Sequence, residues 1–275
     1  CWGMLEKIAP SLLAGVPVIV KPATVSAYLT EVMVREIISS GILPAGAIQL
    51  ICGSTGDLLD KVNEQDVVTF TGSAYTGRKL KSLPNIINNS IPFNMEAASL
   101  NCCILGETVD TASAEFDLFI KEVAREMTVK AGQKCTAIRR TIVPRSKVDA
   151  VSEALKTRLD KISLGDPSIE GVKMGPLVGR AQVQDVRDNV ESLSKSCEII
   201  YGGGNDFEIT GGDSETGAFF PKTLLYCDKP LDAEEPHAVE AFGPVSTIMP
   251  YENLDEAMAL AKLGRGSLVG SIFTA

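Results

Sequence analysis

Residues 16–52, VPVIVKPATVSAYLTEVMVREIISSGILPAGAIQLIC, decide the class of fold. Two short apolar runs, 16–23 and 47–52, are typical of buried strands, and the apolar residues of 24–40 recur at helical spacing. A strand, a helix and a second strand in this order form a parallel pair that the helix covers. These residues therefore predict an α/β fold with a parallel sheet covered on both faces.

The same alternation continues along the chain. A strand at 66–72 leads into a helix from Ser73, and a helical pattern at 1–15 precedes the first strand. We expect two parts, 1–96 and 97–275, and a chain cut from a longer protein, because it opens on Cys1 and closes on an apolar run. The later predicted strands are 101–105, 138–144, 197–203, 222–227 and 244–249, and the later predicted helices are 112–130, 148–162, 180–194 and 253–262.

The composition disfavours several partners. With 26 Lys plus Arg against 35 Asp plus Glu, the net charge is -9, so nucleic acid and anionic membranes are poor partners. The longest apolar runs, 15–20 and 268–273, are far shorter than the roughly 20 residues that span a bilayer. Seven irregularly spaced cysteines and no signal peptide favour a reducing cytoplasm, and a single histidine, His237, without a CxxC pair predicts no metal site.

Cys135, in KAGQKCTAIRR, is the candidate nucleophile. Neighbouring cations and a helix N-terminus favour the thiolate, which is the nucleophilic form. The alternative is a buried structural cysteine, because cysteine is among the most often buried residues. The cations close to it in sequence are Lys130, Lys134, Arg139 and Arg140.

Four other positions are candidates for chemistry or binding. Glu96 lies among apolar or small residues in NMEAASLN, where a carboxylate can have a raised pKa and act as a general base, unless it is simply solvated. The helix start at Ser73 in FTGSAYTG suits a pyrophosphate, although a plain strand-turn-helix connection fits equally. Lys21 ends a strand, at the place where doubly wound folds bind ligands, unless it is simply a solvated lysine. Phe242 in VEAFGPV could pack on a flat ring, unless it is a core phenylalanine.

Taken together, these segments resemble the aldehyde dehydrogenase superfamily. The resemblance covers the whole chain and implies a partial Rossmann-like cofactor domain over 1–96 and an α/β catalytic domain, truncated at its C-terminus, over 97–275. EAASLNCCILGE and AFFPKTLLYC look like the branch of the family in phenylacetate degradation, where a hot-dog-type hydratase domain follows. The segments, in the family's order, are KIAPSLLAG, VIVKPA, FTGSAYTG, NMEAASLN, GQKC, LGDP with MGPL, GAFFPKTLL and EAFGPV.

The resemblance implies a role for each matching residue. Cys135 matches the nucleophile, Glu96 the general base, and Lys7 a lysine that lines the catalytic funnel. Glu240 matches a contact to the nicotinamide ribose, and Phe242 packs beside the nicotinamide. Lys21 and Ser73 match contacts to the adenosine ribose and the pyrophosphate. The full set of implied cofactor-binding positions is Lys21, Thr24, Gly72, Ser73, Gly77, Glu240 and Phe242.

The resemblance also implies a reaction. The Cys135 thiolate attacks the aldehyde to give a thiohemiacetal, whose oxyanion is held by the Cys135 N–H and a side-chain amide. Hydride transfer to the nicotinamide leaves a thioester, and water activated by Glu96 releases the acid. Family members that pass the acyl group to coenzyme A usually lack this glutamate, so Glu96 favours hydrolysis. By the narrower resemblance, the substrate is a CoA-thioester semialdehyde.

The chain departs from the family pattern at two places. Thr24 stands where many members have a glutamate that binds the adenosine ribose, which removes repulsion toward a 2′-phosphate and predicts NADP over NAD. The asparagine that completes the family's oxyanion hole would lie just before Cys1. We therefore expect the activity to belong to the parent protein rather than to this piece alone, and we expect that parent to be a homo-oligomer.

Three alternatives remain open from the sequence. A catalytically silent relative would keep the fold as a binding protein, and an acylating dehydrogenase would use coenzyme A as acceptor. A redox pair at Cys102 and Cys103 is disfavoured, because strand alternation points adjacent side chains to opposite faces and a disulfide between them is strained.

Overall fold

The computed structural model describes residues 2–275. The chain divides into two compact units, residues up to Ala98 and Ser99–Ala275. The boundary expected after Glu96 lies close to this division, and the functional identity of each part stays a prediction. None of the helices in the described residues is long and apolar enough to cross a membrane.

The first unit contains the predicted strand, helix and strand. α1 (Trp2–Leu13) and α2 (Ala27–Ser39) pack against the parallel pair β1 (Val18–Val20) and β2 (Ile48–Leu50), with a short η1 turn (Thr24–Ser26) between β1 and α2. Ile8, Val34 and Ile48 form the buried centre of this small core. The helical spacing of 24–40 therefore marks the residues that cover β1 and β2.

A second parallel pair completes this unit. β3 (Val68–Gly72) pairs with β4 (Phe93–Ala97), and α3 (Ala74–Lys81) and α4 (Pro84–Asn88) lie between them in sequence, after the η2 turn (Leu58–Asp60). The predicted parallel pairing is present, but within this unit the described residues form two separate two-stranded sheets. β1 and β2 are each three residues long.

The second unit is built on a six-stranded sheet in the order β10-β5-β6-β9-β8-β7. All neighbours are parallel except β7 and β8, which run antiparallel at one edge. Its strands are β5 (Cys102–Leu105), β6 (Arg140–Pro144), β7 (Glu198–Tyr201), β8 (Thr223–Tyr226), β9 (Val245–Tyr251) and β10 (Gly270–Phe273).

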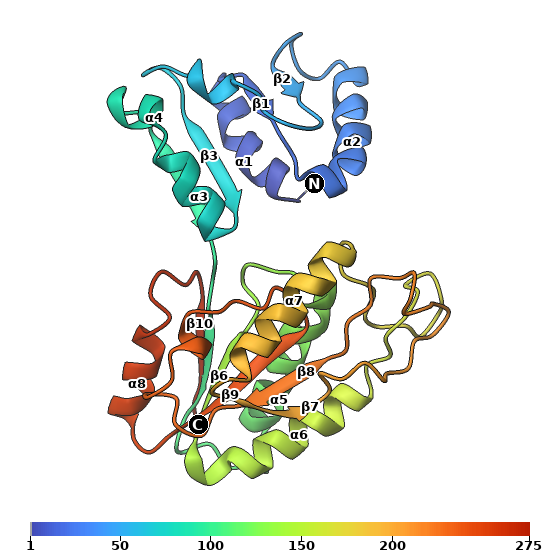
Figure 1. Ribbon diagram of the computed structural model, residues 1–275, viewed down its shortest axis with the longest axis vertical. Coiled ribbons are helices and arrows are strands. Elements are labelled where there is room, and N and C mark those ends of the chain that lie inside the picture. The colour runs from blue at the N-terminus through green and yellow to red at the C-terminus, as the bar shows by residue number, and fades with distance from the viewer. Residues whose placement is uncertain (1) are drawn as a thin grey trace. The chain divides into compact units, whose positions relative to one another are not determined.

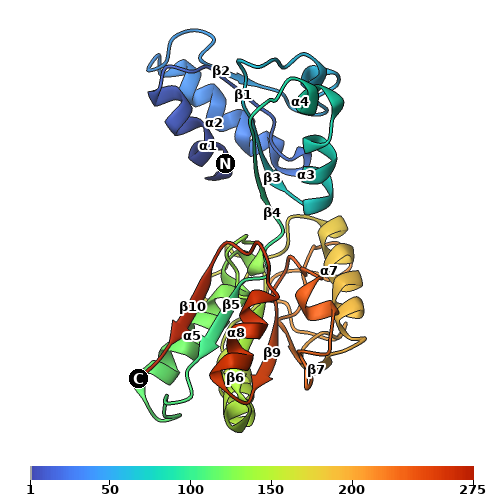
Figure 2. The ribbon, with the colours of Figure 1, turned by 90° about the vertical axis from the view of Figure 1, so that its left-hand side faces the viewer.

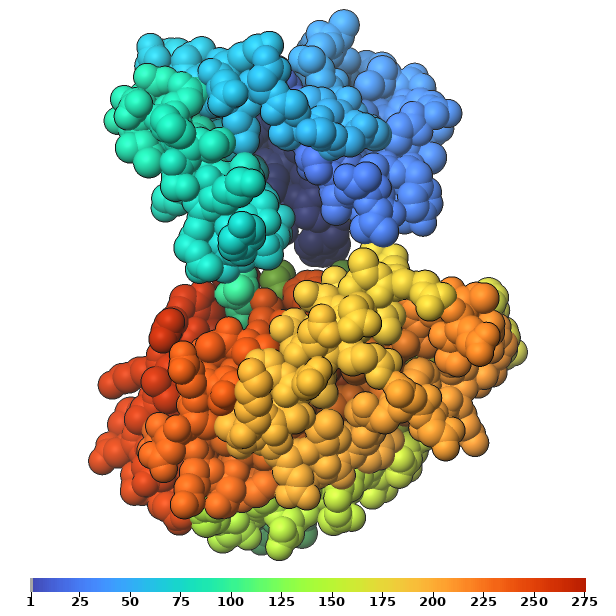
Figure 3. Space-filling view, in the orientation of Figure 1, coloured from blue at the N-terminus to red at the C-terminus, as the bar shows by residue number. Residues whose placement is uncertain are grey.

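Helices cover both faces of this sheet (Figures 1 and 2). α5 (Ala114–Thr128) and α6 (Val148–Asp160) bury one apolar face, and α7 (Arg180–Leu193) and α8 (Leu254–Lys262) the other. Cys102 belongs to the α7 and α8 side and Cys103 to the α5 and α6 side, which confirms their predicted alternation. Figure 3 shows α7, in yellow, on the outer surface of this unit.

Helix α5 ends earlier than the sequence pattern indicated. The predicted helix reached Lys130, whereas α5 stops at Thr128 and a short η3 turn (Val129–Gly132) follows. Lys130, Ala131 and Gly132 have φ values of 54°, 51° and 69°, in the left-handed region that a right-handed helix cannot contain. These three residues turn the chain toward Cys135.

Candidate functional site

The first unit brings together Lys7 and Glu96. Lys7 lies on α1 and Glu96 on β4, and the Lys7 Nζ donates a hydrogen bond to Glu96 Oε1. Both side chains are partly exposed, at 18% and 31% of their area, so the ion pair is reachable from solvent. Thr71 on β3 lies opposite Glu96 in the parallel ladder, and this register sets the position of Glu96 relative to β3.

The predicted cofactor residues of this unit lie after the carboxyl ends of β1 and β3. Lys21 follows β1 directly, Thr24 begins η1, and both are exposed. Ser73 is the N-cap of α3, and its Oγ accepts the Thr76 N–H at 3.2 Å. A cap of this kind leaves the other first-turn N–H groups directed outward from the helix end.

Gly72 and Gly77 permit close packing of α3 on its strands. A Cβ at Gly77 would lie 2.5 Å from Met95 Sδ, and one at Gly72 would lie 2.7 Å from the Phe70 ring. A larger residue at either position would have to displace those side chains. The strand end and the first turn of α3, where a phosphate would bind, therefore favour glycine at both positions.

Cys135 lies in an exposed turn between η3 and β6. The alternative of a buried structural cysteine was therefore wrong. No helix begins at Cys135, so the expected help from a helix N-terminus is absent at this position. Lys134, one of the expected cations, instead donates to the Glu126 carboxylate at 2.6 Å.

Asn101 holds the Cys135 turn from inside the unit. Its Nδ2 donates to the carbonyl oxygens of Cys135 at 2.8 Å and Ala137 at 2.9 Å. Its Oδ1 accepts from Ser99 Oγ at 2.6 Å and from the Val269 N–H at 2.9 Å. Asn101 is 1% exposed, and all four hydrogen bonds are buried or partly buried. Asn101 was not among the predicted site residues, although a polar amide at the start of an otherwise apolar strand is a usable signal.

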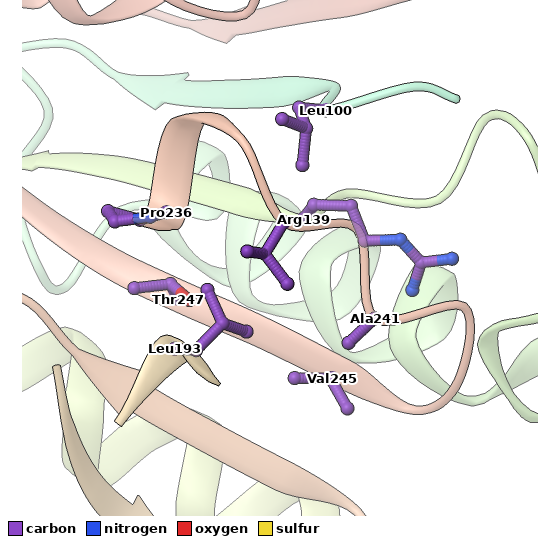
Figure 4. A pocket seen from close by; sticks show the side chains of 8 residues that line it. Leu100, Arg139, Leu193, Pro236, Ala241, Val245 and Thr247 are labelled. Atoms are coloured by element: carbon purple, nitrogen blue, oxygen red, sulfur yellow. The ribbon is translucent and has the colours of Figure 1, made fainter. Parts of the chain in front are cut away.

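Arg139 joins the Cys135 turn to the EAFGPV segment. Its guanidinium donates to the carbonyl oxygens of Gly132 at 2.6 Å and Gly243 at 2.7 Å, and its Cζ lies 5.5 Å from the centre of the Phe242 ring. Burial lowers the pKa of Arg139 to about 10, which still leaves it charged near neutral pH. Figure 4 shows the Arg139 stem beside Ala241 and Leu100, at a small pocket.

Gly132 has to be a glycine for this arrangement. Its φ is +69°, and a Cβ would lie 2.0 Å from the carbonyl oxygen of Gly243. The first residue of GQKC thus lets two backbone segments approach closely, while Arg139 bridges their carbonyl groups.

Glu240 and Phe242 are held by their backbone as well as their side chains. The carbonyl of Glu240 accepts from Asn189 Nδ2 at 3.3 Å, and that of Phe242 accepts from Gln182 Nε2 at 3.1 Å. Both donors belong to α7. Burial raises the pKa of the Glu240 carboxyl, and Arg139 acts in the opposite direction. Phe242 packs against a guanidinium rather than only against apolar core.

The predicted site residues thus fall into two sets, each described within its own unit. Lys7, Lys21, Thr24, Gly72, Ser73, Gly77 and Glu96 belong to the first unit, and Cys135, Glu240 and Phe242 to the second. Between residues 2 and 275, no group of three or more His, Cys, Asp or Glu side chains could hold a metal ion. The oxyanion asparagine expected before Cys1 lies outside the described residues.

Comparison with known proteins identifies relatives along the whole chain. The profile of the aldehyde dehydrogenase family matches residues 2–275. A 3,4-dehydroadipyl-CoA semialdehyde dehydrogenase from Aromatoleum evansii is 48% identical over 99% of this chain and 53% of its own length. Protein MaoC of Klebsiella aerogenes is 48% identical over 37% of this chain and 29% of its own length. The chain spans about half the length of the full-coverage relatives it matches.

Solved structures agree with the fold. A crystal structure of betaine aldehyde dehydrogenase from Staphylococcus aureus in complex with NAD+ superimposes with a TM-score of 0.85 at 29% sequence identity. The match covers 98% of this chain and 51% of that one. These findings confirm the predicted fold class and the predicted resemblance.

Proposed function

Because the chain belongs to the aldehyde dehydrogenase family, we propose that its protein oxidises an aldehyde to a carboxylic acid through a covalent intermediate on Cys135. The observation that carries the proposal is the exposed Cys135 turn, which Asn101 and Arg139 clamp to the rest of the second unit. An exposed thiol on a rigid turn can meet a carbonyl carbon without rearrangement of the backbone.

Cys135 would act first. Its thiolate sulfur forms a bond to the aldehyde carbon while the carbonyl electron pair moves to oxygen, and the Cys135 backbone N–H would stabilise that oxyanion. The bonds from Asn101 to the Cys135 and Ala137 carbonyls fix the peptide planes of the turn, and so hold the N–H direction. When bound, a nicotinamide cofactor supplies the hydride acceptor.

Glu96 would act second, as the general base for hydrolysis. Its carboxylate takes a proton from water while the water oxygen attacks the thioester carbon and the Cys135 thiolate leaves. Lys7 would orient this carboxylate through the ion pair, and rotation of either side chain would free an oxygen for water. Retention of Glu96 supports hydrolysis over transfer to coenzyme A.

The residues of the first unit fit a dinucleotide. The α3 end that Gly72 and Gly77 bring close to β3 offers N–H groups to a pyrophosphate, and Lys21 and Thr24 are exposed after β1. Glu240 and Phe242 would contact the nicotinamide half. Because Thr24 carries no charge and Lys21 is a cation, we infer a preference for NADP over NAD, which fails if the ratio of kcat/KM values favours NAD.

The substrate class follows from the relatives. The Aromatoleum evansii protein is named for a CoA-linked semialdehyde, which supports a CoA-thioester semialdehyde from aromatic degradation here. The match to MaoC supports a parent protein with a fused hydratase domain. We also infer that the parent protein is a homo-oligomer. We infer a cytoplasmic location from the acidic composition and the irregular cysteine spacing.

Product analysis tests the proposal. The full-length parent protein is incubated with NADP and a CoA-thioester semialdehyde, with and without added free coenzyme A, and the products are separated. We expect the acid in both reactions and none with Cys135→Ala. A second CoA thioester at the former aldehyde carbon, formed only with added coenzyme A, would establish the acylating alternative, and no product from the unmutated protein would favour the silent relative.

A further inference from the structure

Two cysteines that the proposed reaction does not use face each other across β7 and β8. The antiparallel register pairs Glu198 with Tyr226 and Ile199 with Leu225, so Cys197 and Cys227 are the next opposite pair at the end of this ladder. Both cysteines are buried, at 7% and 1% exposure, in the core on the α7 and α8 side of the sheet.

The two thiols also share their polar contacts. Each of them shifts the pKa of the other. Cys227 Sγ donates to the Ser196 carbonyl oxygen at 3.6 Å, and the Ser196 hydroxyl lies 3.7 Å from Cys197 Sγ. One residue, Ser196, therefore contacts both sulfur atoms.

This placement suits a covalent bond between them. Residues directly opposite in an antiparallel pair have Cα atoms roughly 4.5–5.5 Å apart. Disulfides span Cα separations of about 4.4–6.8 Å, so the backbone can remain where it is. Cys102 and Cys103 lack this geometry, because they lie on opposite faces of β5.

We propose that Cys197 and Cys227 form a reversible redox pair, which a hydroperoxide oxidises to a cross-strand disulfide. The Cys197 thiolate attacks the peroxide oxygen, the O–O bond breaks, and Cys197 becomes a sulfenic acid while an alcohol or water leaves. The Cys227 sulfur then attacks the Cys197 sulfur, the S–O bond breaks, and the oxygen leaves as water with the Cys227 proton. Two thiols lose two electrons in total, and one peroxide is reduced.

The order of the two steps follows from the asymmetry of the pair. The Cys227 thiol keeps its proton on the Ser196 carbonyl oxygen, whereas the Cys197 sulfur lies beside a hydroxyl. Consistent with this, the neighbouring Cys227 lowers the pKa of the Cys197 thiol, and Cys197 together with burial raises that of Cys227. Cys197 also precedes β7, the edge strand of the sheet, whereas Cys227 follows β8 inside it. Cys197 is therefore the attacking thiol and Cys227 the resolving one.

The disulfide would join the edge strand to its neighbour and close the loop of residues 198–226. It would constrain the unfolded chain and raise the melting temperature of the oxidised protein. This device is independent of the proposed dehydrogenase reaction, and its test requires no substrate.

Peptide mapping after oxidation tests the proposal. The full chain is treated with hydrogen peroxide, remaining thiols are alkylated, and tryptic peptides are analysed by mass spectrometry with and without dithiothreitol. We expect residues 196–222 linked to residues 223–262, and loss of the link on reduction. Absence of that link while Cys135 is oxidised would overturn the proposal.

Variants distinguish the two thiols. In Cys227→Ser, dimedone should trap a sulfenic acid at Cys197, whereas Cys197→Ser should leave Cys227 reduced. Cys103→Ser, which changes a buried cysteine on the other face of the sheet, is the matched control and should retain the link. Equal dimedone labelling at Cys227 in Cys197→Ser would contradict the assigned order, and loss of the link in Cys135→Ser would show that Cys135 is the attacking thiol.

Discussion

At the scale of single residues, Asn101 is expected to position the nucleophile without touching the substrate. In Asn101→Asp, an oxygen replaces the Nδ2 that donates to the Cys135 and Ala137 carbonyls. Two donated hydrogen bonds are replaced by repulsive oxygen–oxygen contacts at a buried position, and each loss costs about 1–3 kcal/mol of free energy. We expect kcat and the rate of Cys135 alkylation by iodoacetamide to fall at least about tenfold, since about 1.4 kcal/mol corresponds to tenfold.

The control for this prediction is Asn205→Asp, which makes the same change at an exposed position. It should leave both rates unchanged. If Asn101→Asp lowers the melting temperature but neither rate, Asn101 has only a structural role. Recovery of the alkylation rate in Asn101→Gln, but not in Asn101→Leu, would support the donated bonds as the cause.

Residues of the site differ in how visible they are in the sequence. Cys135 and Glu96 are recognisable from their motifs, whereas the contact of Lys7 with Glu96 joins residues 89 positions apart and has no local signal. Arg139 is close to the nucleophile in sequence and was expected to act on it as a cation, whereas its guanidinium donates hydrogen bonds to two backbone carbonyl oxygens. Local patterns identify which residues can do chemistry, and long-range packing decides what they contact.

At the scale of elements, the N-caps of α3 and α5 allow an effect on helix stability to be distinguished from an effect on cofactor binding. Ser73 caps α3, and Ser113 caps α5 in the same way through the Phe116 N–H at 3.3 Å. Replacing either serine by alanine should cost about 1 kcal/mol of stability. Only Ser73→Ala should weaken NADP binding, measured by calorimetry, because only α3 lies at the proposed pyrophosphate site. Equal NADP affinity in the two variants would exclude Ser73 from that site.

The elements themselves were largely predictable, with instructive exceptions. β4 was missed because FNMEA lacks the β-branched residues typical of strands, and it forms a strand through its pairing with β3. The antiparallel pairing of β7 with β8 was not predictable, because the residue pattern of a strand does not indicate its direction. The end of α5 at Thr128 coincides with the extended backbone of Val129, and left-handed residues follow from Lys130, neither of which has a signal in the local sequence.

At the scale of the whole molecule, the single histidine gives stability a defined pH dependence. His237 is buried, with Nε2 2.8 Å from the Pro230 carbonyl oxygen and Nδ1 3.3 Å from an Arg140 nitrogen. Burial, with a further contribution from Arg140, lowers the pKa of His237 in the folded state. The unfolded chain then binds more protons, so the free energy of unfolding falls as pH drops below about 6.5.

This prediction is measured by chemical denaturation between pH 5 and pH 8. His237→Gln should flatten the dependence near pH 6, because no histidine remains in the chain. Proton NMR of the one imidazole reports the folded pKa directly. A pKa at or above the value for an exposed histidine would contradict the account.

We propose that Cys135 carries an acyl group that Glu96 helps to release. This is tested by rapid mixing of the full-length parent protein carrying Glu96→Gln with NADP and a semialdehyde, following reduced cofactor. We predict one equivalent of reduced cofactor per Cys135 in a burst, then steady turnover about 10²–10⁴-fold slower than in the unmutated protein. Steady turnover at the unmutated rate would exclude Glu96 as the base, and silence of both proteins would contradict the dehydrogenase assignment.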